Sequence, residues 1–243
     1  MDYHRSPSLL ATIPSSKHFH DYVVPLVVLL SFTAVFRVTD LDLVFSALFY
    51  SPTEGWKYYS WTFCRLAYNY GALPALGLTI LAGITVLGSL VRNSLAAYRR
   101  PAMFIVMLMA LGPGLMVNLM KNNTGRPRPM EIADFGGTRE FLKPLSLGEP
   151  GNGESFPSGH ASMGFFLEAP YFILRRSRPA TARVCLALGI ASGLAIGAAR
   201  MAQGGHFASD VLWSWGMVHL NALILSHMLN LERPRFRQLP LPE

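Results

Sequence analysis

The sequence predicts an all-α polytopic membrane protein with six transmembrane helices, and three observations support this fold class. The chain has 243 residues, of which 51% are hydrophobic and only 14% are charged, whereas a soluble domain carries roughly 25% charged residues. Residues 71–91 and 101–120 contain no ionisable side chain, and each is long enough to cross the roughly 30 Å hydrocarbon layer. Basic residues gather in alternate loops, as they do beside membrane spans.

The remaining spans are shorter or contain polar residues. Residues 22–37 lie between Asp21 and Arg37, whose side chains can extend toward lipid head groups. Residues 184–199 are rich in glycine and alanine, which allows close packing of helices. The predicted membrane domain covers residues 21–232 between tails at 1–20 and 233–243, and its spans are residues 22–37, 71–91, 101–120, 160–175, 184–199 and 208–231.

Other segments are expected to depart from plain membrane-spanning helices. Residues 41–50 are too short to cross and contain Asp42, while residues 51–70 are crowded with aromatic side chains, which indicates a helix along the membrane surface. Pro113, between two glycines, is expected to kink the third span. Residues 121–157 are rich in glycine and proline, and loops of this length usually carry function or are disordered.

The basic segments determine the expected orientation. The positive-inside rule places four of them in the cytoplasm, at residues 1–20, 92–100, 175–183 and 233–243. The connections between the other span ends then face the opposite side, at residues 38–70, 121–157 and 200–206. The N-terminal segment is polar and lacks a small-residue cleavage pattern, so a retained tail is expected. The same basic loops account for the net charge of +7, and no nucleic-acid partner is expected.

Three polar motifs lie at the outer ends of predicted spans, at residues 121–129, 156–160 and 200–210. Ionisable groups are costly at membrane depth and usually mark function. Because the three motifs share one membrane face, we expect them to form a single site.

The composition of the motifs indicates phosphate binding. Lys121, Arg128 and Arg200 supply fixed positive charge for a dianionic group, and the planar guanidinium suits phosphate. Ser158 and Gly159 begin a predicted helix, where a hydroxyl and unpaired backbone N–H groups can bind an anion.

Two histidines are expected to divide the chemistry of phosphate-ester cleavage. His206 and Asp210 are four residues apart, so a helix starting after Gly205 would place both on one face and let the carboxylate orient the imidazole. His206 is therefore the expected nucleophile, with a phosphohistidine intermediate. His160 is the expected general acid and then the base for water.

In order, the motifs Lys-x6-Arg-Pro, Pro-Ser-Gly-His and Arg-x5-His-x3-Asp resemble those of the type 2 phosphatidic acid phosphatase superfamily. The resemblance implies a metal-independent lipid phosphatase with a six-helix membrane core. It assigns phosphate-binding and catalytic roles to Lys121, Arg128, Ser158, Gly159, His160, Arg200, His206 and Asp210. Ala199 departs from the family pattern, because a serine commonly precedes the arginine of the third motif, and one hydroxyl contact is lost.

Within that superfamily, the Phe135-Gly136-Gly137 turn and the Gly-Gly-His-Phe-x-Ser-Asp form resemble bacterial phosphatases of envelope lipids, including those that act on lipid A. Such a site would face the periplasm from the inner membrane. Lipid A is the favoured substrate, and undecaprenyl pyrophosphate and phosphatidylglycerophosphate remain alternatives. Transfer of the phosphate to a lipid acceptor and, in another class of protein, lipid transport also remain open.

No cofactor is expected, because no cysteine or histidine cluster has zinc-site spacing. Cys64 and Cys185 fall on opposite sides of the bilayer in the predicted topology, so a disulfide between them is not expected.

Several ionisable residues stand outside the motif set. Arg126 is expected to meet lipid head groups. Glu168 lies roughly 12 Å deeper than His160 along a helix, which is too far for direct catalysis. An acidic residue within a span is expected to have either a functional role or a packing role there. Glu154 can face the substrate or solvent, and His219 and His227 are expected to pack within the last span.

Overall fold

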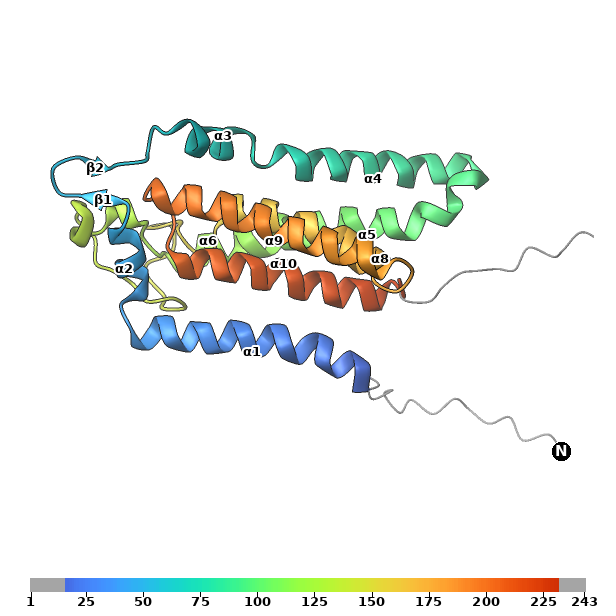
Figure 1. Cartoon of the computed structure of the whole chain (residues 1–243), viewed down its shortest axis with the longest axis horizontal. Helices are drawn as coiled ribbons and strands as arrows, with labels where there is room; N and C mark the ends of the chain where they lie inside the picture. The colour runs from blue at the N-terminus through green and yellow to red at the C-terminus, as the bar shows by residue number, and fades with distance from the viewer. Residues whose placement is uncertain (1–15, 232–243) are drawn as a thin grey trace, which may run out of the picture.

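The computed structural model describes residues 16–231, which form a bundle of helices running side by side. Short helices, a two-stranded hairpin and the long loops gather at one end of this bundle, which we call the loop end (Figure 1). The tail predictions for residues 1–15 and 232–243 lie outside the described residues. The helix α1 begins at Ser16, six residues before the expected start of the first span.

The long elements follow the predicted spans closely. The first two are α1 (Ser16–Val38) and α4 (Leu73–Val91), and the third span is built from α5 (Arg99–Met109), η2 (Ala110–Met116) and α6 (Val117–Thr124). The later ones are α7 (Gly159–Phe165), η5 (Phe166–Glu168), α8 (Ala169–Leu174), α9 (Pro179–Ala202) and α10 (Ala208–Met228). The segment η2 is a π-helix with Pro113 inside it, so the regular α-helix is interrupted where a kink is predicted, and a π segment is one of the known causes of kinks.

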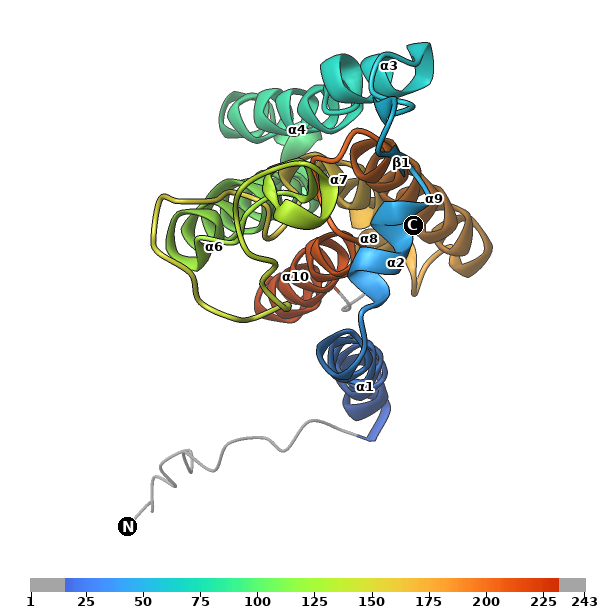
Figure 2. The ribbon, with the colours of Figure 1, turned by 90° about the vertical axis from the view of Figure 1, so that its left-hand side faces the viewer.

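The short elements connect the long helices. Most lie at the loop end: α2 (Leu41–Ala47), the antiparallel strands β1 (Tyr50–Ser51) and β2 (Gly55–Trp56), α3 (Thr62–Tyr70), and the 3-10 turns η3 (Pro129–Glu131) and η4 (Ala133–Phe135). The 3-10 helix η1 (Asn93–Tyr98) joins α4 to α5 at the opposite end. Figures 1 and 2 show α3 turned across the direction of α4.

Four helical stretches are long and apolar enough to cross a membrane: Phe19–Val38, Thr62–Val91, Asn93–Glu131 and Pro179–Ala202. The helix α4 is an example. Its side chains of Leu81 and Ile84 are more than 60% exposed, whereas a helix of a soluble protein would bury most such side chains. The predicted spans at 160–175 and 208–231 are different. The former is broken by η5, and eleven of the 21 residues of α10 are buried, including several polar ones. Six spans therefore stay a prediction.

Close contact between α7 and α9 depends on glycine. A Cβ atom on Gly193 would lie 2.2 Å from the ring of Phe165, and one on Gly164 would lie 2.7 Å from the Cα of Gly193. The two backbones can approach because neither residue has a side chain there. This packing confirms the expectation drawn from the glycine and alanine content of residues 184–199.

The helix α3 packs against the end of α9. Buried Cys64 and Ala67 of α3 share a small cluster with Ile196, Ala199 and Ala202 of α9. Ala199 is 2% exposed, so the residue that replaces the family's usual serine serves this helix contact.

Candidate active site

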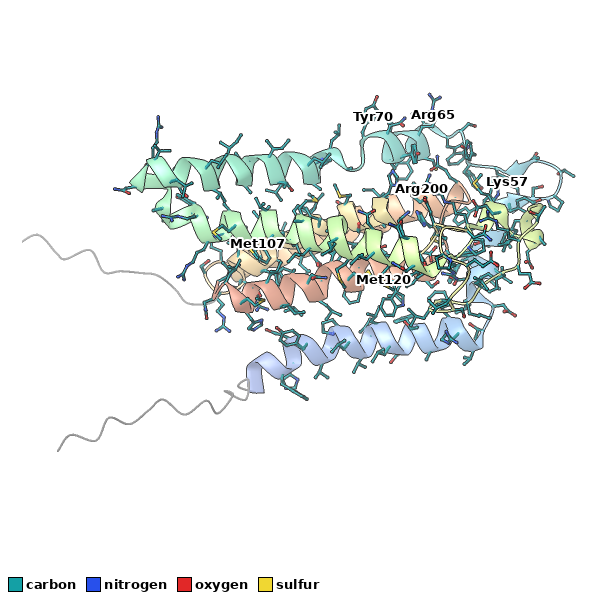
Figure 3. The ribbon with its side chains drawn as sticks, turned by 180° about the vertical axis from the view of Figure 1, so that it is seen from behind. Lys57, Arg65, Tyr70, Met107, Met120 and Arg200 are labelled. Atoms are coloured by element: carbon teal, nitrogen blue, oxygen red, sulfur yellow. The ribbon has the colours of Figure 1, made fainter. Side chains whose placement is uncertain are left out.

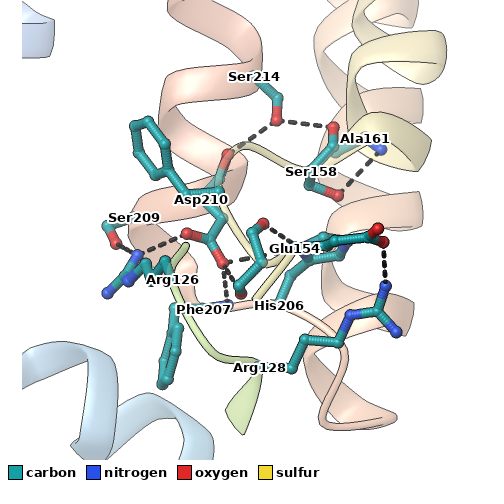
Figure 4. Close-up of polar contacts among 12 residues, drawn as sticks. Arg126, Arg128, Glu154, Ser158, Ala161, His206, Phe207, Ser209, Asp210 and Ser214 are labelled. Atoms are coloured by element: carbon teal, nitrogen blue, oxygen red, sulfur yellow. Dashed lines mark hydrogen bonds and ion pairs between the residues drawn. The ribbon is translucent and has the colours of Figure 1, made fainter. Parts of the chain in front are cut away.

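The structure places all eight residues predicted for the site at the loop end. They are Lys121 at the end of α6, Arg128 in the following loop, Ser158, Gly159 and His160 at the start of α7, Arg200 at the end of α9, His206 in the next turn and Asp210 in the first turn of α10. Figure 4 shows how the ends of α7 and α10 and the loops between them hold most of the polar contacts.

The ring of His206 is oriented mainly by backbone. Its Nδ1 lies 2.7 Å from the carbonyl oxygen of Ser155 and 3.6 Å from Oδ2 of Asp210. A carbonyl oxygen can only accept a hydrogen bond, so Nδ1 carries the ring proton and the lone pair of Nε2 is free. The prediction that a helix starting after Gly205 places His206 and Asp210 on one face needs correction. The helix begins at Ala208, so His206 precedes it and the two side chains do not share a helix face.

The surroundings of His206 favour its neutral form. Its side chain is almost completely buried, and burial lowers the pKa of the ring while Asp210 opposes that shift. The ordinary histidine pKa is about 6.5, so the ring is neutral at pH 7. A neutral imidazole with a free Nε2 lone pair is the form that nucleophilic attack requires.

Asp210 fixes the turn that carries His206. Its Oδ2 accepts hydrogen bonds from the Ser155 hydroxyl at 2.5 Å and from the Phe207 backbone N–H at 2.8 Å. The second bond joins the third residue of α10 to the residue that precedes the helix, an arrangement that stabilises helix starts. Asp210 thus ties α10 to the loop before α7, and the Ser155 carbonyl reaches His206 from that loop.

Arg126 is buried beside Asp210, and the expectation that it meets lipid head groups is wrong. The side chain is 1% exposed. Its NH1 donates to Asp210 at 2.5 Å and to the Ser209 hydroxyl at 2.8 Å, while its NH2 donates to Asp42 at 2.7 Å. The guanidinium also lies over the ring of Phe207, 4.4 Å from its centroid. A buried cation requires such charge partners, and two carboxylates provide them.

Asp42 of α2 completes this buried network. Its carboxylate accepts from the Ser209 backbone N–H at 2.9 Å and from the Ser209 hydroxyl at 2.5 Å, so it also binds the N-terminus of α10, where a negative charge is favoured. Burial raises the pKa of Asp42, and Arg126 opposes that shift. The short helix α2 is therefore joined to the start of α10 by an ion pair with Arg126 and by hydrogen bonds from Ser209.

Arg200 depends on the two glycines that follow it. A Cβ on Gly205 would lie 2.4 Å from NH2 of Arg200, and Gly204 has a φ of +67° and packs against the ring of Trp56. Because neither glycine carries a side chain, the chain folds back over the guanidinium. NH1 of Arg200 donates to Gln203 at 2.5 Å.

Two buried donors without partners indicate a candidate anion-binding part of the site. In residues 16–231, Nε of Arg128 and Nε of Arg200 are buried and have no hydrogen-bond partner. Nearby, Nζ of Lys121 donates to the Glu154 carbonyl at 3.0 Å, and Arg128 forms an exposed ion pair with the Glu154 carboxylate at 3.2 Å. Buried N–H groups without acceptors are rare, so these donors fit an anionic ligand.

The start of α7 brings the second histidine to the site. Ser158 is buried and its hydroxyl accepts from the Ala161 backbone N–H at 3.3 Å, so it caps the helix. Gly159 lies against the side chain of Lys121. His160 is partly exposed and stacks on Tyr68 of α3, with ring centroids 4.8 Å apart and planes 20° apart.

A pocket of about 460 Å³ opens beside these groups. One part of its lining comes from α3 and the segment before it, and the other part comes from the end of α9 and the loop that carries Arg128. The lining residues are Tyr59, Ser60, Arg65, Tyr68, Asn69, Arg128, Met130, Arg200 and Gln203.

Sequence reasoning missed three residues of this arrangement. Asp42 offered a signal, because an acidic residue in an apolar segment usually has a buried partner. Tyr68 was one of many aromatic residues in a segment interpreted as a membrane anchor. Ser155 gave no signal, since its backbone carbonyl makes the decisive contact.

Glu168 lies away from the site. It is fully buried, and its Oε1 lies 3.1 Å from Nδ1 of His219, which supports the packing interpretation of both residues. His227 lies 2.9 Å from the Tyr22 hydroxyl of α1. Across residues 16–231, no group of three or more His, Cys, Asp or Glu residues could hold a metal ion.

Fold and site together define a helical membrane protein with a cationic, histidine-containing centre at one end of its helices. The chain belongs to the PAP2 superfamily, whose match covers residues 101–234, more than half of the chain. The match includes every residue of the predicted site.

Relatives point in the same direction. The lipid A 4'-phosphatase of Francisella tularensis subsp. novicida (strain U112) is 34% identical over 152 residues, which cover 60% of this chain and 67% of that protein. The lipid A 4'-phosphatase of Rhizobium leguminosarum is 36% identical over 108 residues, covering 43% of this chain and 45% of that protein. No solved structure matches the chain.

Proposed function

We propose that this protein is a phosphatase of lipid A, embedded in the bacterial inner membrane with its site facing the periplasm. The observation that carries the proposal is His206, whose Nδ1 is bound to a carbonyl oxygen so that Nε2 is free to attack. The relatives are lipid A 4'-phosphatases by name, and this supports the choice of lipid.

The first step transfers phosphate to the protein. Nε2 of His206 attacks phosphorus, the bond from phosphorus to the ester oxygen breaks, and the imidazolium form of His160 donates its proton to the departing oxygen, which leaves His160 neutral. The proton on Nδ1 remains there and stays hydrogen-bonded to the Ser155 carbonyl oxygen. The carboxylate of Asp210 stabilises the positive ring that forms. Lys121, Arg128 and Arg200 balance charge on the phosphate oxygens.

The second step regenerates His206. His160 removes a proton from water, the water oxygen attacks phosphorus, and the bond between phosphorus and Nε2 breaks. Inorganic phosphate leaves, and the ring of His206 is neutral again. The cycle assigns every proton to a residue of this chain and needs no metal ion.

The pocket supports a bulky polar head group. Its 460 Å³ is far more than a phosphate group fills, and its wall carries hydroxyl, amide and aromatic side chains, including Ser60, Asn69 and Tyr59. Such a wall suits a sugar, whose hydroxyls need hydrogen bonds and whose faces pack on rings. A glycolipid fits this wall better than a prenyl pyrophosphate does.

Phosphate release by purified protein from lipid A, undecaprenyl pyrophosphate and phosphatidylglycerophosphate tests the proposal. We expect the protein to release phosphate from lipid A and to keep the same activity in chelator. We expect no phosphate release by His206→Ala, and a trapped phosphoprotein in His160→Ala when the substrate has a good leaving group.

Retained turnover by His206→Ala would exclude the mechanism, and activity that needs an added divalent ion would exclude metal independence. Phosphate recovered on a second lipid would indicate a phosphotransferase, and no release from any lipid would favour a transporter.

A further inference from the structure

We propose that Tyr68 is a positioning residue that holds both His160 and Arg200 in place for catalysis. The inference rests on the proposed function, because it assigns a task to those two groups. It also gives α3, expected from the sequence only to anchor the chain at the membrane surface, a part in the active site.

The ring of Tyr68 contacts the two groups through its face. The imidazole of His160 is stacked on it, with centroids 4.8 Å apart and a 20° angle between planes. The guanidinium carbon of Arg200 lies 4.6 Å from the same centroid. One aromatic ring from α3 therefore touches the expected general acid and one of the phosphate-binding cations.

The position of Tyr68 is fixed by the packing of α3 on α9. Cys64, one turn before Tyr68, and Ala67, directly before it, share a buried cluster with Ala199 of α9. A second tie comes from Gln203, whose amide donates to the Tyr59 carbonyl at 3.2 Å while its oxygen accepts from Arg200 at 2.5 Å. Because α3 packs on α9 and the segment before α3 is hydrogen-bonded to Gln203, the backbone that carries Tyr68 is held beside the site.

The chemistry of an aromatic face suits both neighbours. The face carries partial negative charge, which attracts a guanidinium and the positive form of an imidazole. Parallel stacking also restricts the plane of the His160 ring, and a general acid must direct its proton at the departing oxygen. Both ring contacts are made through the face of the ring, so the phenol hydroxyl is not needed for them.

Three variants separate this role from simple anchoring. Tyr68→Leu removes the ring, Tyr68→Phe keeps the ring without the hydroxyl, and Tyr70→Leu removes a second tyrosine of α3. Tyr70 is 56% exposed, and Figure 3 shows it directed away from Arg200. Tyr70→Leu is thus the matched control for loss of an aromatic anchor, and thermal unfolding in detergent checks that each variant is folded.

The readout is the difference in kcat loss between two substrates with different leaving groups, because a purely structural role would affect both substrates equally. A lipid alkoxide must be protonated as it leaves, whereas p-nitrophenolate leaves without a proton. We expect Tyr68→Leu to lower kcat by about tenfold or more on the lipid phosphate, and clearly less on p-nitrophenyl phosphate. A higher inhibition constant for inorganic phosphate would report the Arg200 contact. Tyr68→Phe should stay within about twofold of the wild type, and Tyr70→Leu should match it.

Equal losses on both substrates, a Tyr68→Phe variant as impaired as Tyr68→Leu, or a Tyr68→Leu variant that behaves like Tyr70→Leu would each overturn the proposal. Failure of the proposed function looks different. In that case the wild-type protein releases phosphate from neither substrate, and the Tyr68 role falls with it.

Discussion

Arg126 shows how a single charge can organise this site at the scale of residues. Its guanidinium donates to Asp42 of α2 and to Asp210 of α10, and it is among the largest fully buried side chains in residues 16–231. Removing one member of a buried ion pair leaves an uncompensated charge, which costs about 3–5 kcal/mol. The network therefore makes folding of the catalytic turn dependent on Arg126.

We predict that Arg126→Met lowers stability by about 3–5 kcal/mol and abolishes phosphate release. The matched control is Arg139→Met, because Arg139 forms an exposed ion pair with Glu131, with the two side chains 39% and 35% exposed, and such pairs contribute about 1 kcal/mol or less. Thermal unfolding in detergent measures both variants. An Arg126→Met protein as stable as the control would show that the two carboxylates are not charged together in the fold.

At the scale of elements, the turn between α9 and α10 carries two residues of the proposed active site. It places Arg200 before the turn and His206 within it, and both positions depend on the backbone of Gly204 and Gly205. A displacement of about 1 Å in a catalytic group can cost about a hundredfold in rate. The turn is therefore more sensitive to added atoms than the helices on either side.

We predict that Gly205→Ala reduces kcat/KM for phosphate release by about a hundredfold while the protein stays folded. The added Cβ would lie 2.4 Å from NH2 of Arg200, and it would displace the guanidinium from the phosphate. Gly77→Ala in α4 is the control, because a Cβ there meets nothing within 4 Å. Steady-state kinetics with both variants would refute this account if their activities were equal.

At the scale of the whole molecule, the proposed active site and the 3-10 helix η1 lie at opposite ends of the bundle (Figure 1). We predict that these ends lie on opposite sides of the membrane, with residues 121–157 outside. In a variant with Cys64 and Cys185 replaced by alanine, Glu140→Cys should react with a membrane-impermeant maleimide on spheroplasts. Ser94→Cys should react only after permeabilisation, and the reverse pattern would invert the topology.

The helices could be predicted because their signal is local. Four of the expected spans coincide with stretches long and apolar enough to cross a membrane, since apolar length is a property of consecutive residues. The predicted span at 208–231 is not among these stretches. About half of α10 is buried among other helices, which can satisfy its polar side chains. That shielding is not visible in the sequence of α10.

The sequence by itself determined the helical membrane class and the motif residues, including Lys121 and His206, because spacing and residue type carry both. The tertiary structure decided which groups support them. Arg126 meets Asp42 across 84 positions of sequence, and the ring of His206 is oriented by the carbonyl of Ser155. A backbone carbonyl has no side-chain identity, and the partner of a buried charge is chosen by packing, so only the folded chain could specify these contacts.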